Sequence, residues 1–245
     1  MIGYRARLGF LLPPGNPTIE PEMMAMCPPE KLPGVSLHFH RMVARGTPGA
    51  LDGQAERNRQ MVASLDDCVA TLALVKPDII VIAHTATSYD LGRDAEDALL
   101  SRLADQCGTR VATAFGSLAA GLERLSVKRI ALGAPYSAEV TAKGKAHLEA
   151  HGFAVVHHEN LQGHANIYDS TAEQAYRLAR AVDRPGAEAV VLSGTGMPTV
   201  SVLDMLEADL HKPVVSSNSA MMWLALRACG VMQPIAGYGR LLTLD

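Results

Sequence analysis

Short apolar runs alternate with longer amphipathic segments along this chain, and most of the apolar runs end in small or polar residues. The continuous runs at 78–83 and 188–193 predict strands buried on both faces, as in a parallel sheet covered by helices. Further strands are expected at 7–12, 35–42, 110–113, 128–132, 153–157 and 213–216. Helices are expected from Asn16, across 48–75 in one or two pieces, at 93–106, 115–125 and 170–182, and in segments ending near 151, 210 and 229.

The order of these elements repeats between the two halves of the chain. Three pairs of segments match in kind: 7–22 with 128–143, 77–88 with 187–199, and 109–125 with 212–228. The repeat predicts an α/β fold with two pseudo-symmetric lobes, each a four-stranded, mostly parallel sheet flanked by helices. We expect an N-terminal lobe at 1–126 and a C-terminal lobe at 127–245, with terminal segments free to exchange between them. Ligands of such sheets bind beyond the carboxyl ends of the strands, so the active site is expected between the lobes.

The charge and the cysteines of the chain limit the kinds of partner and ligand that it is expected to bind. The formal net charge is −3 without a basic or acidic block, which argues against nucleic acid and anionic membranes as partners. No apolar run is long enough for a signal peptide or a membrane span, so we expect a cytoplasmic protein. The four cysteines have no metal-ligand or disulfide spacing and are interpreted as free thiols: Cys27, Cys68, Cys107 and Cys229.

Small polar residues gather where the predicted strands end. They are Asn16, the segments 85–88 and 136–137, the segment 193–196 and the segment 217–219. Neutral hydrogen-bond donors beside backbone N–H groups at helix starts suit a bound carboxylate. The alternative is that these residues only cap helices and form turns. Their recurrence at equivalent strand ends in both halves favours a binding site.

Five motifs, in order along the chain, give the sequence a family resemblance. They are PxxNPTIEPEM, DIIVIAHTATS, GAPYSAE, VVLSGTGMPT and PVVSSNSAMMWLALR. Over nearly its whole length the chain resembles the maleate isomerase and arylmalonate decarboxylase group of the aspartate/glutamate racemase superfamily. The resemblance implies two lobes with the active site between them, no metal or organic cofactor, and a small mono- or dicarboxylic acid as substrate. Proteins of this group are often dimers or tetramers, so a homo-oligomer is expected.

The resemblance also implies which residues meet the substrate. Asn16, Thr87, Ser88, Tyr136 and Asn166 match positions that hold a substrate carboxylate, and the backbone N–H of Thr195 completes the anion hole. Isomerases of this group use two cysteines, and the decarboxylases keep only the second. Here the two positions are interpreted as Ala86 and Gly194. The predicted substrate-binding set is therefore Asn16, Ala86, Thr87, Ser88, Asn166, Gly194, Thr195 and Gly196.

Because neither Ala86 nor Gly194 can act as a nucleophile or acid, other groups have to supply the chemistry. His84 could be a general base or a structural residue, and Tyr136 could donate a proton or bind the carboxylate. The segment 157–169 carries His157, His158, Glu159, His164 and Asp169, but their spacing matches no standard metal site, and we expect a solvated loop over the cleft.

The hypothesis is a cofactor-independent isomerase or decarboxylase-like enzyme that stabilises an enediolate with neutral donors. Two alternatives stay open: a non-catalytic carboxylate-binding homologue, and a lyase or hydrolase that uses His84 or Tyr136.

Overall fold

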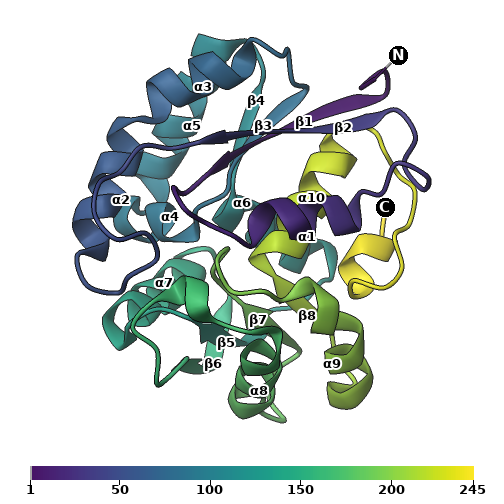
Figure 1. Cartoon of the computed structure of the whole chain (residues 1–245). Coiled ribbons are helices and arrows are strands. Elements are labelled where there is room, and N and C mark those ends of the chain that lie inside the picture. Colours follow the sequence, from purple (N-terminus) through teal and green to yellow (C-terminus); the bar gives the residue numbers. More distant parts are fainter. Residues whose placement is uncertain (1) are drawn as a thin grey trace.

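Two four-stranded parallel sheets form the framework of the protein, whose computed structural model describes residues 2–245 (Figure 1). The first sheet has the order β2 (Val35–Arg41), β1 (Ala6–Leu12), β3 (Ile79–Ile82) and β4 (Arg110–Thr113). The second has the order β6 (Ala154–Asn160), β5 (Arg129–Ala134), β7 (Ala189–Leu192) and β8 (Val214–Ser216). Each half thus places its strands in the same spatial order, which confirms the predicted fold class and its internal repeat.

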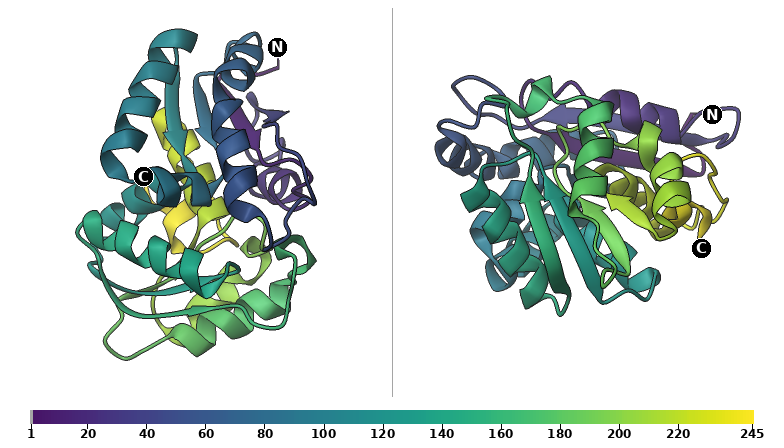
Figure 2. Two further views of the ribbon diagram at one scale, coloured as in Figure 1. Left: turned by 90° about the vertical axis from the view of Figure 1, so that its left-hand side faces the viewer. Right: turned by 90° about the horizontal axis from the view of Figure 1, so that it is seen from below.

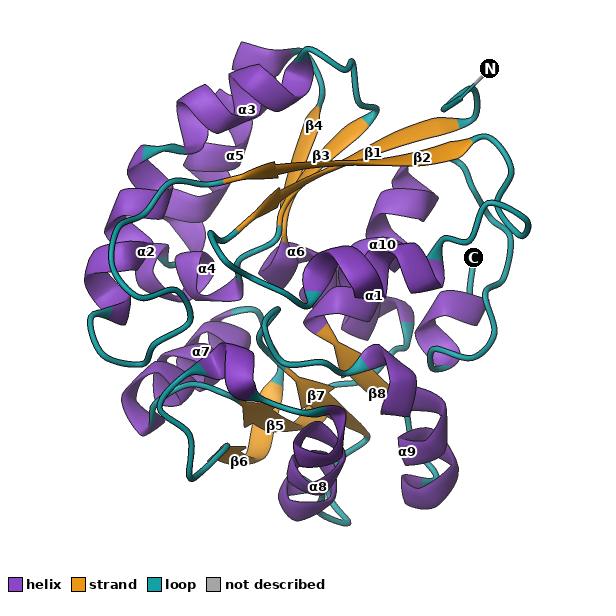
Figure 3. Ribbon diagram, viewed as in Figure 1, coloured by secondary structure: helices purple, strands orange, loops and turns teal. Residues whose placement is uncertain are grey.

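Helices cover both faces of the first sheet and flank the second (Figure 3). They are α1 (Ile19–Met26), α2 (Gln54–Ala63), α3 (Leu65–Ala73), α4 (Thr85–Leu91), α5 (Arg93–Cys107), α6 (Ala114–Arg124), α7 (Ala138–Ala150), α8 (Ala172–Val182), α9 (Leu203–Leu210) and α10 (Ser217–Ala228). Three short 3₁₀ helices are η1 (Ile167–Asp169), η2 (Val200–Val202) and η3 (Arg240–Thr243). No helix within residues 2–245 is both long and apolar enough to cross a membrane.

Two local expectations differ from the structure, and a third is confirmed. The predicted turn after β3 is a short helix, α4, which ends at the left-handed Gly92 before α5 begins. The segment after β7 is a turn followed by η2 and α9, which confirms the predicted turn and the helix ending near 210. Strand β6 continues to Asn160, because its backbone pairs with β5 as far as Ala134.

One apolar cluster extends through both halves, and a second, smaller one lies within the first half. The central strands β3 and β7 are buried along their whole length, as their β-branched sequences predict. Helix α10 follows a strand of the second sheet but packs against α6 and α1 of the first half, and Figure 2 shows the C-terminal segment, in yellow, beside that half. The carboxyl ends of both sheets therefore face one common region, which lies between the two halves.

Candidate active site between the sheets

A pocket lies where the carboxyl ends of the two sheets face each other. It encloses about 470 Å³ of space not filled by protein atoms, part of which opens to solvent. The first half contributes, among others, Asn16, Gln54, Arg57, Asn58 and His84. The second half contributes Tyr136, Ile167, Tyr168, Thr195 and Gly196. Five of the predicted residues line this pocket at the strand ends: Asn16, His84, Tyr136, Thr195 and Gly196. Their role in substrate binding or catalysis stays a prediction.

Asn16 comes at the turn after β1 and presents an amide nitrogen at the pocket. Its Oδ1 accepts hydrogen bonds from the backbone N–H of Thr18 at 2.9 Å and of Ile19 at 3.1 Å, which fixes the side chain at the start of α1. Its Nδ2 is buried and has no hydrogen-bond partner within residues 2–245. Because an unpaired buried donor is costly, this N–H₂ group is suited to a ligand oxygen.

His84 follows β3 and reaches the pocket as a neutral imidazole. Burial lowers its pKa from the usual 6.5 to about 4, so the ring carries no charge at neutral pH. Its Nδ1 lies 2.7 Å from the Thr87 hydroxyl oxygen, one turn further along α4. Its Nε2 makes no hydrogen bond to any part of the chain that the structure describes. The ring is thus oriented through Nδ1 and can act through Nε2.

Tyr136 follows β5 and supplies a neutral phenol. Burial raises the pKa of its hydroxyl well above the ordinary value, so it stays protonated and can donate a hydrogen bond. Its ring packs edge-on against Tyr89, with centroids 6.3 Å apart. The hydroxyl of Tyr89 itself lies 2.5 Å from that of Ser193, so it is already engaged within the core.

Thr195 and Gly196 offer backbone N–H groups from the turn after β7. The Thr195 hydroxyl donates to the Ala83 carbonyl at 3.0 Å, which ties this turn to the end of β3. The Thr195 carbonyl accepts from Asn218 at 3.3 Å. Because the C=O and N–H of one peptide group point in opposite directions, this bond turns the N–H of Gly196 away from Asn218. Neither the N–H of Thr195 nor that of Gly196 has a partner in the described chain.

Three predicted residues on α4 lie behind the pocket wall. Ala86 is 1% exposed and packs in the apolar core. Thr87 is not among the pocket-lining residues, but its hydroxyl lies within hydrogen-bond distance of His84, which is. The Ser88 hydroxyl donates at 2.7 Å to Glu96, which sequence reasoning missed. Burial raises the pKa of Glu96, but hydrogen bonds from His147, Ser88 and Thr113 outweigh it and hold the pKa below its usual value. Contact of Ala86, Thr87 and Ser88 with a substrate stays a prediction.

Asn166 sits at the rim of the pocket and joins the two halves. Its Oδ1 accepts from the Tyr168 N–H at 2.9 Å, and its Nδ2 donates to the Pro48 carbonyl at 2.9 Å. The N–H of Ile167 donates to the Gly49 carbonyl at 2.7 Å, which adds a second link between the same two loops. Both ends of the Asn166 amide are therefore engaged in holding these loops together, and its role in substrate binding stays a prediction.

The backbone conformation and the packing at position 194 accommodate only glycine. Its φ is +108°, and a Cβ there would lie 2.7 Å from Pro135 Cδ and 3.3 Å from the Tyr136 hydroxyl. Gly194 is the second residue after β7, and His84 is the second residue after β3. The internal repeat therefore pairs Gly194 with His84, whereas Ala86 lies further along α4.

Introducing cysteine at 194 is expected to destabilise the protein by about 1–3 kcal/mol, because a side chain meets a positive φ and the Pro135 ring. Urea denaturation of Gly194→Cys measures the loss. Gly186→Cys is the matched control, since an added Cβ there has nothing within 4 Å. Equal stability of the two variants would contradict the close packing at Gly194.

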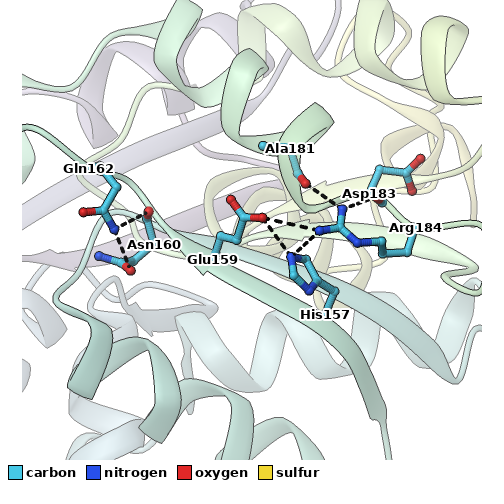
Figure 4. Close-up of polar contacts among 7 residues, drawn as sticks. All are labelled: His157, Glu159, Asn160, Gln162, Ala181, Asp183 and Arg184. Atoms are coloured by element: carbon cyan, nitrogen blue, oxygen red, sulfur yellow. Dashed lines mark hydrogen bonds and ion pairs between the residues drawn. The ribbon is translucent and has the colours of Figure 1, made fainter.

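The histidine-rich segment 157–169 begins on β6 and continues through a loop into η1. None of its histidines and acidic residues lines the pocket, although Ile167 and Tyr168 of the same segment do. His157 Nε2 lies 2.8 Å from a Glu159 oxygen and 2.6 Å from a guanidinium nitrogen of Arg184. Arg184 also donates to the carbonyls of Ala181 and Asp183, both at 2.7 Å, and so caps the end of α8. Figure 4 shows this cluster joining the edge strand to that helix. The expected solvated loop is thus partly a strand with a structural ion-pair cluster.

The pocket wall contains no thiol in the described chain, since none of the four cysteines is among its lining residues. Burial raises the pKa of Cys27 and of Cys229 to about 11, which disfavours a reactive thiolate at either. Within residues 2–245 no three side chains of the His, Cys, Asp and Glu types come together as metal ligands would.

Comparison with known proteins shows which family this chain belongs to. A model of the arylmalonate decarboxylase family matches residues 8–242. The chain belongs to the arylmalonate decarboxylase family. This agrees with the resemblance expected from the five motifs.

Two curated relatives of the family member are enzymes. The maleate isomerase of Nocardia farcinica is 29% identical over 251 residues, covering 98% of this chain and 96% of the relative. The arylmalonate decarboxylase of Bordetella bronchiseptica is 28% identical over 170 residues, covering 66% of this chain and 70% of the relative. Their names are those of an isomerase and a carboxy-lyase, the two classes that the sequence predicted.

A solved structure shares the fold. The Nocardia farcinica maleate cis-trans isomerase, a cysteine-to-serine variant with a covalently bound succinylcysteine intermediate, matches with a TM-score of 0.87 and 28% identity. The match covers 98% of this chain and 99% of the isomerase.

Proposed function

We infer that this family member isomerises a small carboxylic acid by moving a proton at the carbon next to the carboxylate, with His84 as the base. The observation that carries this is the neutral, well-oriented imidazole at the pocket wall. It occupies one of the two equivalent strand-exit positions of the internal repeat, where the chain has no thiol. The ligand's carboxylate is assigned to the unpaired donors on the other strand exits.

The proton moves in two steps. His84 Nε2 takes the proton from the α-carbon and becomes imidazolium, while the C–H electron pair moves toward the carboxylate and gives an enediolate. The Asn16 amide, the Tyr136 hydroxyl and the backbone N–H groups of Thr195 and Gly196 stabilise the extra charge by hydrogen bonds. Once the planar enediolate has turned its other face toward His84, the imidazolium returns the proton to that face, and the configuration of the α-carbon is inverted. This restores the neutral base, so no cofactor enters the cycle.

Isomerisation is favoured over decarboxylation by the protonation state of His84. Loss of CO₂ leaves an enediolate that needs a proton from an acid. With a pKa of about 4, the imidazolium is scarce at neutral pH, and burial makes Tyr136 a weak acid. A neutral imidazole, by contrast, is ready to accept a proton.

Proton NMR in D₂O tests the proposal on a panel of malonates, maleate, aspartate, succinate, succinate monoamide and hydroxydicarboxylates. Deuterium entry at the α-carbon, or isomerisation, is the expected result. Loss of CO₂ without prior deuterium exchange would contradict the proposed isomerase and indicate a decarboxylase instead. Ligand line broadening with no turnover would instead establish a non-catalytic carboxylate-binding protein.

A further inference from the structure

One wall of the pocket carries polar side chains that the proton transfer does not use. They come from the first turns of α2, namely Gln54, Arg57 and Asn58. Residues three and four apart share one face of a helix, so this α2 wall faces the pocket as a unit. The opposite face of α2 holds exposed residues such as Arg59.

Asn58 brings an unpaired acceptor to the α2 wall. It is 3% exposed, and its Nδ2 donates to an Asp90 carboxylate oxygen at 2.7 Å. Because a carboxylate only accepts, this bond fixes which end of the amide is nitrogen. Asn58 Oδ1 is then an acceptor, and it has no partner in the part of the chain described.

Gln54, one turn earlier, brings a second unpaired amide oxygen to the same wall. It is 9% exposed, and its Oε1 is also buried without a partner among residues 2–245. Two buried acceptors on one pocket wall call for a ligand that donates hydrogen bonds, because buried polar atoms are seldom left unpaired.

Arg57 adds a donor between them. Its guanidinium donates to the backbone carbonyl of Asp52 at 2.7 Å and to that of Ala50. It forms no ion pair with a carboxylate in the described chain, so its charge is not neutralised by the protein. The α2 wall therefore offers two acceptors and one cationic donor within one helical turn.

We propose that the α2 wall selects a substrate whose far end is a neutral carboxamide, that is, the monoamide of a short dicarboxylic acid. The proposal rests on the function inferred above, because the acid end occupies the anion hole. The amide N–H₂ donates to Asn58 Oδ1 and Gln54 Oε1, and the amide carbonyl accepts from Arg57. A second carboxylate would set its oxygens against two acceptors, and an alkyl group would leave every partner unpaired.

Calorimetric titration with three ligands of similar shape tests the α2 wall: succinate monoamide, succinate and 4-methylpentanoate. The monoamide is expected to bind at least about tenfold more tightly than either of the others, because only it pairs both acceptors. Asn58→Leu should weaken binding of the monoamide about tenfold or more while leaving 4-methylpentanoate bound as well as before. Gln54→Leu provides the same test if Asn58→Leu does not fold, and Arg59→Leu on the outer face should change neither affinity.

The outcomes separate this proposal from the proposed function. Equal binding of all three ligands, or tighter binding of succinate, would overturn the selection of an amide while leaving the carboxylate site intact. If none of the three ligands binds, the carboxylate-binding site itself is wrong, and the proposed function falls with it.

Discussion

Replacing His84 with asparagine is expected to lower kcat/KM by about 100- to 10,000-fold, the usual contribution of a positioned general base. Asparagine can keep a hydrogen bond to the Thr87 hydroxyl, which lies 2.7 Å from Nδ1 of the histidine. It has no counterpart of Nε2, so the proton-accepting atom is lost while the start of α4 is preserved. Deuterium exchange of the substrate that the D₂O panel identifies measures the rate.

The pH profile supplies the diagnostic control for this variant. The base works only when neutral, and the pKa of His84 is lowered to about 4 by burial. For the wild-type protein kcat/KM should therefore be flat across neutral pH and fall as the pH drops through about 4, with folding checked by circular dichroism at each pH. His211→Asn, at an exposed histidine, should behave like wild type. Unchanged turnover in His84→Asn would remove His84 from the chemistry.

The fold could be predicted because local patterns of apolar and polar residues indicate its strands and helices. Buried strands such as β3 and β7 are short β-branched runs, and their repetition in both halves implied two equivalent sheets. What the pattern could not provide is geometry that depends on long-range contacts. The conformation of the turn after β7, for example, is set by hydrogen bonds to Thr18 at the start of α1 and to Asn218 on α10.

The residues of the candidate site likewise fall into those that the sequence could predict and those that it could not. The strand-end rule found Asn16, His84 and Tyr136, because topology alone brings strand exits together. It missed Gln54 and Asn58, since polar residues in a helix give no sign of which face turns inward. Their four-residue spacing was the available signal. Homo-oligomerisation and a cytoplasmic location stay predictions.

The choice between Ala86 and His84 shows how a motif and a structure can differ by half a helical turn. The motif places Ala86 in the cysteine position, but counting from the end of each strand pairs Gly194 with His84. Only His84 of the two lines the pocket.

The largest loss of stability is expected for Glu22→Leu, at about 3–5 kcal/mol, because the substitution leaves three buried hydrogen-bond donors without an acceptor. Each such donor costs about 1–3 kcal/mol when unpaired. One Glu22 oxygen accepts from the N–H groups of Thr199 and Val200, at 2.6 and 2.9 Å. The other accepts from Asn218 Nδ2 at 2.6 Å. The residue is 7% exposed, and this burial raises the pKa of its carboxyl group. Urea denaturation measures the loss.

Glu22 also connects stability to the site, which a matched pair of variants can resolve. Asn218 donates to both Glu22 and the Thr195 carbonyl, so the carboxylate indirectly orients the peptide group that carries the Gly196 N–H. Glu22→Gln keeps an acceptor for Thr199 and Val200 but turns a donor toward Asn218, and about 1–2 kcal/mol of lost stability with a raised KM is expected. Glu20→Leu, which breaks a half-exposed ion pair on the same helix, should cost no more than about 1 kcal/mol and leave KM unchanged. If Glu22→Leu were no less stable than Glu20→Leu, the Glu22 carboxylate would not be what holds the turn after β7 against α1.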